Sequence, residues 1–174
     1  SPPQMMGAGG PDAFGYRWMD SDEPGGPVFN WVDITTVGTQ ITDWGSGSGD
    51  EGHNIQTLPF NFPFYGTAYS SVKITTNGFV SFDVASTNHT YTNAAIPATG
   101  EPNLNVFGFW DDLDVRTAGG IYYYHDVANN RYIIEYYNAP HYSTGGPYTF
   151  EIILNSSGQI LCQYLSMTDP LNSS

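Results

Sequence analysis

The chain has 174 residues, a length that suits a single domain with a buried core. It carries 4 Lys and Arg against 17 Asp and Glu, which gives a formal net charge of -13. Such a charge repels phosphate backbones and anionic lipid surfaces, so nucleic acid is not an expected partner. Aromatic residues make up 16% of the chain and charged residues 12%, a composition that favours a β-rich extracellular domain over a cytosolic enzyme.

Both ends of the chain have the composition of tails. Residues 1–11 are rich in Pro and Gly and have little tendency to order by themselves. We therefore expect an extended N-terminal tail over residues 1–11, one β-sandwich domain over residues 12–168, and a C-terminal tail over residues 169–174. No apolar run is long enough to cross a bilayer, so membrane insertion is not expected. The chain starts at Ser1, and we expect a secreted protein from which a signal peptide has been removed.

The segment after the tail alternates aromatic residues with small or polar ones. Phe14, Tyr16 and Trp18 follow this spacing, and Phe29 and Trp31 repeat it after a Pro/Gly turn. Alternation of this kind is typical of β-strands, whose successive side chains point to opposite faces. The pattern therefore predicts strands on both sides of the turn, and the Gly- and Ser-rich stretch that follows them predicts a loop.

From residue 58 onward the sequence predicts a succession of antiparallel hairpins. The strongest signal is Asn77-Gly78, which predicts a type I′ turn between strands at residues 72–76 and 79–83. Two further hairpins are predicted, one joining residues 121–125 to 131–137 and one joining residues 148–154 to 159–164. Because no stretch shows a sustained helical period, the expected fold is all-β, an antiparallel two-sheet β-sandwich of jelly-roll-like type with essentially no helix.

Alternation within the last hairpin assigns side chains to faces of the sheet. One face carries Tyr148, Phe150, Ile152 and Leu154, which leaves Thr149 and Glu151 outward. Cys162 is the single cysteine, so an intrachain disulfide is impossible, and its spacing predicts a small side chain on the inward face.

Three phrases of aromatic and turn residues follow one another through the middle of the chain. They are Phe62-Pro63-Phe64-Tyr65-Gly66, Asn77-Gly78-Phe79-Val80-Ser81-Phe82 and Phe107-Gly108-Phe109-Trp110-Asp111-Asp112-Leu113-Asp114. Together they resemble the nidogen-like extracellular module, an antiparallel β-sandwich of large secreted and surface proteins, including many bacterial ones. The resemblance extends from about Gly10 to about Leu165. It implies that the protein works outside the cell or at the cell surface.

Two acidic stretches are candidates for binding calcium. Asp20, Asp22 and Glu23 stand before a Pro-Gly pair and match the front half of a calcium loop, in which alternate carboxylates point inward. The twelfth position of such a loop supplies a bidentate Glu in helix-loop-helix sites, but here it is Trp31. Calcium would therefore need further ligands from elsewhere, and a solvated acidic turn is the alternative.

The second acidic stretch follows Trp110 and consists of Asp111, Asp112 and Asp114. Acidic residues after this Trp in the nidogen-like family look like turn-capping or cation-linked groups, so a structural use is the expected role. Carboxylates that hydrolyse a glycoside must flank a sugar-sized cleft, which three residues on one turn rarely do. The four histidines are dispersed without the spacing of a zinc site. We expect no catalytic site and no cofactor other than calcium.

These observations predict a non-enzymatic extracellular structural or assembly protein. We expect a subunit of a surface fibre or matrix that associates with copies of itself through its tail or its sheet edges. The alternative is a carbohydrate-binding or adhesion module of a larger secreted hydrolase, because the many tyrosines of residues 122–142 include some outside the core. Extracellular glycans are then the partner. N-glycosylation signals at Asn88, Asn155 and Asn172 fit either setting.

Overall fold

The computed structural model describes residues 7–97 and 99–168, and these residues form mostly strands and loops. Among them, the only helix is a single 3-10 turn, η1 (Val127–Asn129). None of the described helices is long and apolar enough to cross a membrane. The chain divides between Val32 and Asp33 into two compact units. The predicted all-β class with essentially no helix is confirmed.

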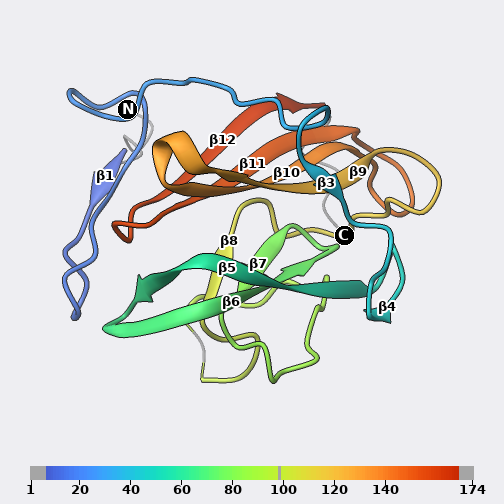
Figure 1. Ribbon diagram of the computed structural model, residues 1–174, viewed down its shortest axis with the longest axis horizontal. Helices are drawn as coiled ribbons and strands as arrows, with labels where there is room; N and C mark the ends of the chain where they lie inside the picture. Colours follow the sequence, from blue (N-terminus) through green and yellow to red (C-terminus); the bar gives the residue numbers. More distant parts are fainter. Residues whose placement is uncertain (1–6, 98, 169–174) are drawn as a thin grey trace, which may run out of the picture. The chain divides into compact units, whose positions relative to one another are not determined.

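The unit that begins at Asp33 contains two five-stranded antiparallel sheets (Figure 1). The first sheet has the order β12-β11-β10-β9-β3, and the second has the order β4-β5-β6-β7-β8. The strands are β3 (Thr39–Gln40), β4 (Ser46–Gly47), β5 (Gly52–Phe64), β6 (Thr67–Thr75), β7 (Phe79–Ser81), β8 (Asn105–Phe107), β9 (Gly120–Asp126), β10 (Arg131–Ala139), β11 (Tyr148–Asn155) and β12 (Ile160–Met167). The two packed sheets confirm the predicted β-sandwich.

The core between the sheets is aromatic and is tied together by a buried hydroxyl. The ring of Tyr136 in β10 stacks on Phe150 in β11 with centroids 4.4 Å apart. Its hydroxyl donates a 2.8 Å hydrogen bond to the carbonyl of Thr75 at the end of β6. A buried Tyr hydroxyl needs such a partner, so this bond fixes the first sheet against the second.

The hairpin predicted at Asn77-Gly78 is present, but its turn is not the predicted type I′. Ile74 of β6 pairs with Val80 of β7, and the loop at the tip is longer than two residues. A type I′ turn requires positive φ at both central residues. Gly78 has φ of 78°, whereas Asn77 is not left-handed, because its side chain is committed to the buried network described below. A side chain at position 78 would also collide with the carbonyl oxygen of Phe109.

The two other predicted hairpins are confirmed as β9–β10 and β11–β12. Thr149 and Glu151 lie on the face of β11 opposite the core, as predicted, but both are buried. The Glu151 carboxylate accepts a hydrogen bond from the Gln163 amide at 2.6 Å. Glu135 of β10 lies opposite Glu151, is only 1% exposed, and accepts the Ile34 N–H at 2.8 Å. Thr149, Glu151 and Glu135 are therefore interior groups although they lie on the face of the first sheet that points away from the core.

The unit that ends at Val32 contains a two-stranded sheet of β1 (Ala8–Gly9) and β2 (Trp18–Met19). Part of the predicted N-terminal tail thus pairs with the segment that follows it. The strands predicted at Phe14 and Tyr16 and at Phe29 and Trp31 are not formed. At the first of these places the Asp12 carboxylate accepts three successive backbone N–H groups and holds a turn. Residues 1–6 and 169–174 of the predicted tails lie outside the described residues.

Candidate functional site

One end of the sandwich gathers four loops into a polar cluster (Figure 1). They are residues 48–51 between β4 and β5, residues 76–78 between β6 and β7, residues 108–119 before β9, and residues 140–147 after β10. Backbone hydrogen bonds join them. In each, an N–H group donates to a backbone carbonyl, and the donor and acceptor residues are Val115 and Gly49, Thr76 and Gly52, Phe109 and Gly78, and Tyr142 and Asp112. The loops therefore form one connected surface rather than four separate ends.

Asn77 is the centre of this cluster and is fully buried. Its Oδ1 accepts the Leu113 N–H at 3.1 Å, and its Nδ2 donates to the His89 carbonyl at 2.7 Å and to Glu51 Oε2 at 3.2 Å. One amide side chain thereby connects three loops that are far apart in the sequence. This commitment explains why Asn77 does not adopt the left-handed conformation that an Asn-Gly turn usually takes.

Three carboxylates converge next to Asn77. Asp50, Glu51 and Asp112 each place one ligand atom within 4.8 Å of the others, and we call them the acidic cluster. Burial is the main cause that raises the pKa of all three carboxyls, that of Glu51 to about 6. Nearby carboxylates add to the shift: Asp50 repels Glu51 and Asp112, and Asp114 repels Asp50. Two of the cluster residues, Asp50 and Glu51, lie in the Gly/Ser stretch that the sequence predicts as a loop, which also contains the short strand β4.

The three predicted aspartates after Trp110 have separate surroundings. Asp112 joins the acidic cluster, whereas Asp111 is buried and faces His141 Nε2 at 3.6 Å. Because His141 Nδ1 accepts the Ser143 N–H, the Nε2 carries the proton and points at Asp111. Asp114 forms a bidentate pair with Arg116, whose bonds lower the pKa of that carboxyl.

Arg116 also lies 3.0 Å from Asp50 Oδ2, so one guanidinium is shared between Asp114 and Asp50. The ring of Tyr142 lies under the same guanidinium, with its centroid 5.8 Å away. Arg116 is half-exposed and is therefore screened by solvent, which limits how much of the negative charge it can offset.

The other predicted calcium ligands lie in the unit that ends at Val32. There the Asp22 N–H donates to Asp20 Oδ1 at 3.0 Å, and the Gly26 N–H donates to the Glu23 carbonyl, which makes a compact turn. Within residues 7–97 and 99–168, one group of three carboxylates lies close enough together to hold a metal ion. This group contains Asp112 but not Asp20, Asp22 or Glu23. The calcium prediction at these residues stays a prediction.

Asp50 and Glu51 are the residues of this candidate site that the sequence did not indicate. The available signal was an Asp-Glu pair at the end of a Gly/Ser loop, directly before a long strand. The pair meets Asp112 only because β5 begins at the same end of the sandwich at which the segment before β9 lies. No local spacing encodes that meeting.

The outer face of β6 and β7 is covered by the long segment between β7 and β8. Lys73 of β6 is buried and donates from Nζ to the Ser86 carbonyl at 2.7 Å. The Trp110 indole N–H donates to the Thr90 carbonyl at 2.8 Å. His53 and His89 face each other with their Nδ1 atoms 3.1 Å apart, and burial lowers the pKa of both imidazoles. These polar contacts anchor the segment over the sheet.

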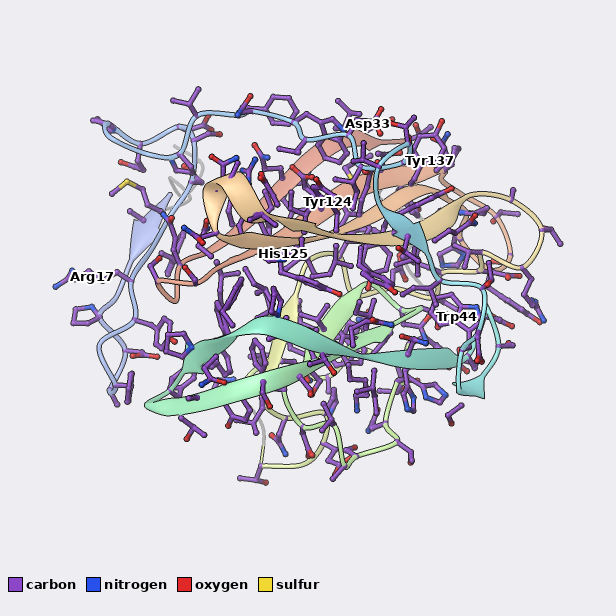
Figure 2. All side chains as sticks on the ribbon, in the orientation of Figure 1. Arg17, Asp33, Trp44, Tyr124, His125 and Tyr137 are labelled. Carbon is purple, nitrogen blue, oxygen red and sulfur yellow. The ribbon has the colours of Figure 1, made fainter. Side chains whose placement is uncertain are left out.

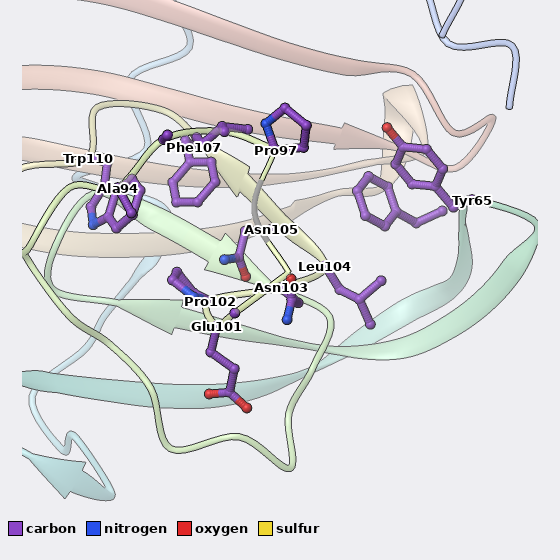
Figure 3. A pocket seen from close by; sticks show the side chains of 14 residues that line it. Tyr65, Ala94, Pro97, Glu101, Pro102, Asn103, Leu104, Asn105, Phe107 and Trp110 are labelled. Carbon is purple, nitrogen blue, oxygen red and sulfur yellow. The ribbon is translucent and has the colours of Figure 1, made fainter. Parts of the chain in front are cut away.

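A pocket of about 210 Å³ lies between this segment and β8 (Figure 3). Its lining includes the aromatic residues Tyr65, Phe107 and Trp110, and the rings of Phe107 and Trp110 stack with centroids 4.5 Å apart. The amide of Asn105, also in the lining, has a buried oxygen and a buried nitrogen without hydrogen-bond partners among the described residues. The pocket thus combines aromatic faces with one unsatisfied donor and one unsatisfied acceptor.

Two of the three predicted glycosylation signals lie within the described residues. Asn88 is half-buried, and its Oδ1 accepts the Thr90 N–H at 3.0 Å. Asn155 is half-buried at the end of β11, and Asn172 lies outside the described residues. Their use as glycosylation sites stays a prediction.

Comparison with known proteins adds the family. The sequence model of a family described as NIDO related matches residues 28–174, which include every strand of the two five-stranded sheets. No solved structure matches the chain. The match covers most of the chain and agrees with the resemblance carried by the three aromatic phrases. Membership of this family indicates an extracellular module. The chain belongs to the NIDO-related family.

Proposed function

We propose that the protein is a non-enzymatic structural module that acts outside the cell by associating with copies of itself through the free edge of β12. The observation that carries this proposal is the shape of the sheet edges. The edge strands β3 and β4 have two residues each, and β8 has three. β12 has eight residues and, among the described residues, pairs with β11 alone.

A long edge strand presents a row of N–H and C=O groups that another strand can pair with. Natural proteins usually shorten such edges or place charges on them. The β12 edge has neither protection. Its residues Ile160–Met167 include no charged side chain, while Tyr164 is 47% exposed and Leu165 is 51% exposed. This composition supports pairing with a second copy of the chain.

The surroundings of the reactive side chains support action by association rather than by catalysis. Burial raises the pKa of the Cys162 thiol to about 11, so the nucleophilic thiolate is scarce at neutral pH. Asp111 and Asp114 are engaged by His141 and Arg116. The calcium that the sequence predicts is a separate proposal, because self-association through β12 does not require it.

Replacing Leu165 by lysine tests the proposed edge. A charge on the free edge opposes strand addition without changing the core, since Leu165 is half-exposed. We expect the wild type to show a mass that rises with concentration in light scattering, and the Leu165→Lys variant to need roughly tenfold higher concentration for the same rise. Val127→Lys is the matched control, because Val127 is 68% exposed in η1 and lies outside β12. A wild type that stays monomeric contradicts the proposal.

Glycan binding is the second candidate, and the pocket at β8 is the observation that favours it. Sugar rings stack on aromatic faces and offer neighbouring hydroxyls that satisfy an amide such as that of Asn105. The tyrosines of residues 122–142 differ in exposure. The three in β9 are half-buried, Tyr132 and Tyr136 in β10 are buried, and Tyr137 and Tyr142 are exposed. Figure 2 labels Tyr124 and Tyr137.

A glycan array with two variants separates these possibilities. We expect Asn105→Ala to remove any neutral-glycan signal of the wild type, because it takes away the unsatisfied donor and the unsatisfied acceptor of the pocket. Tyr137→Ala, on an exposed strand position, is expected to leave that signal unchanged. An array without any wild-type signal, or a signal lost only with Tyr137→Ala, counts against the pocket.

A further inference from the structure

The acidic cluster holds more negative charge than its neighbours balance. Asp50, Glu51 and Asp112 place ligand oxygens within 4.8 Å of one another. The nearest cation is Arg116, which is half-exposed and shared with Asp114. Like charges at this separation repel strongly when they are partly buried. Such a group is stable only if it stays partly protonated or meets another positive charge.

A second, independent observation points to a missing ligand. Asp50 is 9% exposed, and its Oδ2 contacts Arg116. Its Oδ1 is buried and has no hydrogen-bond partner among the described residues. Nearly all buried polar atoms in proteins are satisfied, and an orphaned carboxylate oxygen costs more than a neutral one. In a cluster of three carboxylates, a bound cation would satisfy this oxygen.

The donor atoms define the class of ion. All three converging groups are carboxylates. Carboxylates are hard oxygen ligands, which suit calcium better than they suit softer metals. Asn77 fixes one of them, because its amide donates to Glu51 Oε2. Glu51 and Asp112 are half-buried, so water can complete the coordination shell.

We propose that Asp50, Glu51 and Asp112 bind one calcium ion at the end of the sandwich. The ion ties the turn between β4 and β5 to the segment before β9, two parts of the chain that Asn77 also connects. Its role is to stabilise this end of the fold. The site is independent of the proposed association at β12, so either can fail without the other.

Terbium luminescence is a direct probe of the site, since Tb³⁺ replaces Ca²⁺ and is sensitised by nearby Trp. Trp110 stands two residues before Asp112, and the Trp44 indole, labelled in Figure 2, lies beside Gly49. We expect Tb³⁺ emission on Trp excitation, competition by Ca²⁺, and a higher melting temperature in Ca²⁺ than in a chelator.

Two variants and one control locate the ion. Asp112→Asn and Glu51→Gln keep the size of each side chain and remove one charge. Each is expected to lower the affinity for Ca²⁺, measured by calorimetric titration, by roughly tenfold or more. Asp22→Asn, in the other acidic stretch, is expected to leave the affinity unchanged. If Asp112→Asn fails to fold, Glu51→Gln decides. A folded wild type that binds no Ca²⁺, or binding lost with Asp22→Asn and kept in both cluster variants, overturns the proposal.

Discussion

Replacing Asn77 by alanine is expected to lower the free energy of unfolding by about 3 to 5 kcal/mol, because a buried group that loses its partner costs about 1 to 3 kcal/mol. The Asn77 amide satisfies the Leu113 N–H, the His89 carbonyl and Glu51 Oε2. Alanine removes the hydrogen-bond partner of all three groups, and Leu113 is fully buried. Denaturant unfolding followed by Trp fluorescence measures the change.

The matched control for this prediction is Asn93→Ala. Asn93 is exposed, and its amide donates one 2.8 Å hydrogen bond to the Trp110 carbonyl. Water can replace that bond, so we expect a loss of no more than about 1 kcal/mol. If both variants lose the same small amount, Asn77 is an ordinary turn residue and not the centre of the loop cluster.

Raising the pH from 5 to 8 is expected to destabilise the fold through Glu135. Burial is the main cause that raises the pKa of Glu135 to about 7 from an ordinary 4.5, with a smaller contribution from Asp33, while the Ile34 N–H opposes the shift. The folded state therefore holds a proton that the unfolded state has lost, so stability falls as pH rises through this window. At 1.36 kcal/mol for each pH unit, the loss approaches about 3 kcal/mol above pH 7.

Glu135→Gln isolates this contribution. The amide keeps an oxygen for the Ile34 N–H and cannot ionise, so we expect the variant to be more stable than the wild type at pH 8 and similar at pH 4. Glu51, whose pKa is also raised, titrates in the same direction and remains in both proteins, so the difference between the two curves belongs to Glu135. Parallel curves for the two proteins would show that Glu135 does not carry the effect.

The hairpins could be predicted because their signals are local. Asn-Gly bends, polar turns and period-two alternation lie within a few residues of each other, and they identified the β6–β7, β9–β10 and β11–β12 pairs. The turn type at Asn77 could not be predicted in the same way. Its local preference is outweighed by hydrogen bonds to Leu113, His89 and Glu51, which come from distant parts of the chain.

The candidate site was predictable only in part. Asp112 stood out because three aspartates follow one Trp, but Asp50 and Glu51 sit in a Gly/Ser loop and meet Asp112 only after the sheets pack. Alternation also placed Glu151 outward without showing that the outward face is buried. Strand periodicity distinguishes the two faces of a sheet; what covers the second face depends on the path of the rest of the chain.

The most direct test of association through β12 is hydrogen exchange measured across a range of protein concentrations. Within the described residues, the amides of residues 160–167 that face away from β11 have no strand partner in a single copy, and they become hydrogen-bonded when a second strand adds. Association through β12 predicts that exchange in this segment slows as concentration rises, while exchange in β10 stays constant. Exchange in β12 that does not depend on concentration, while light scattering shows larger species, would contradict it and place the contact elsewhere.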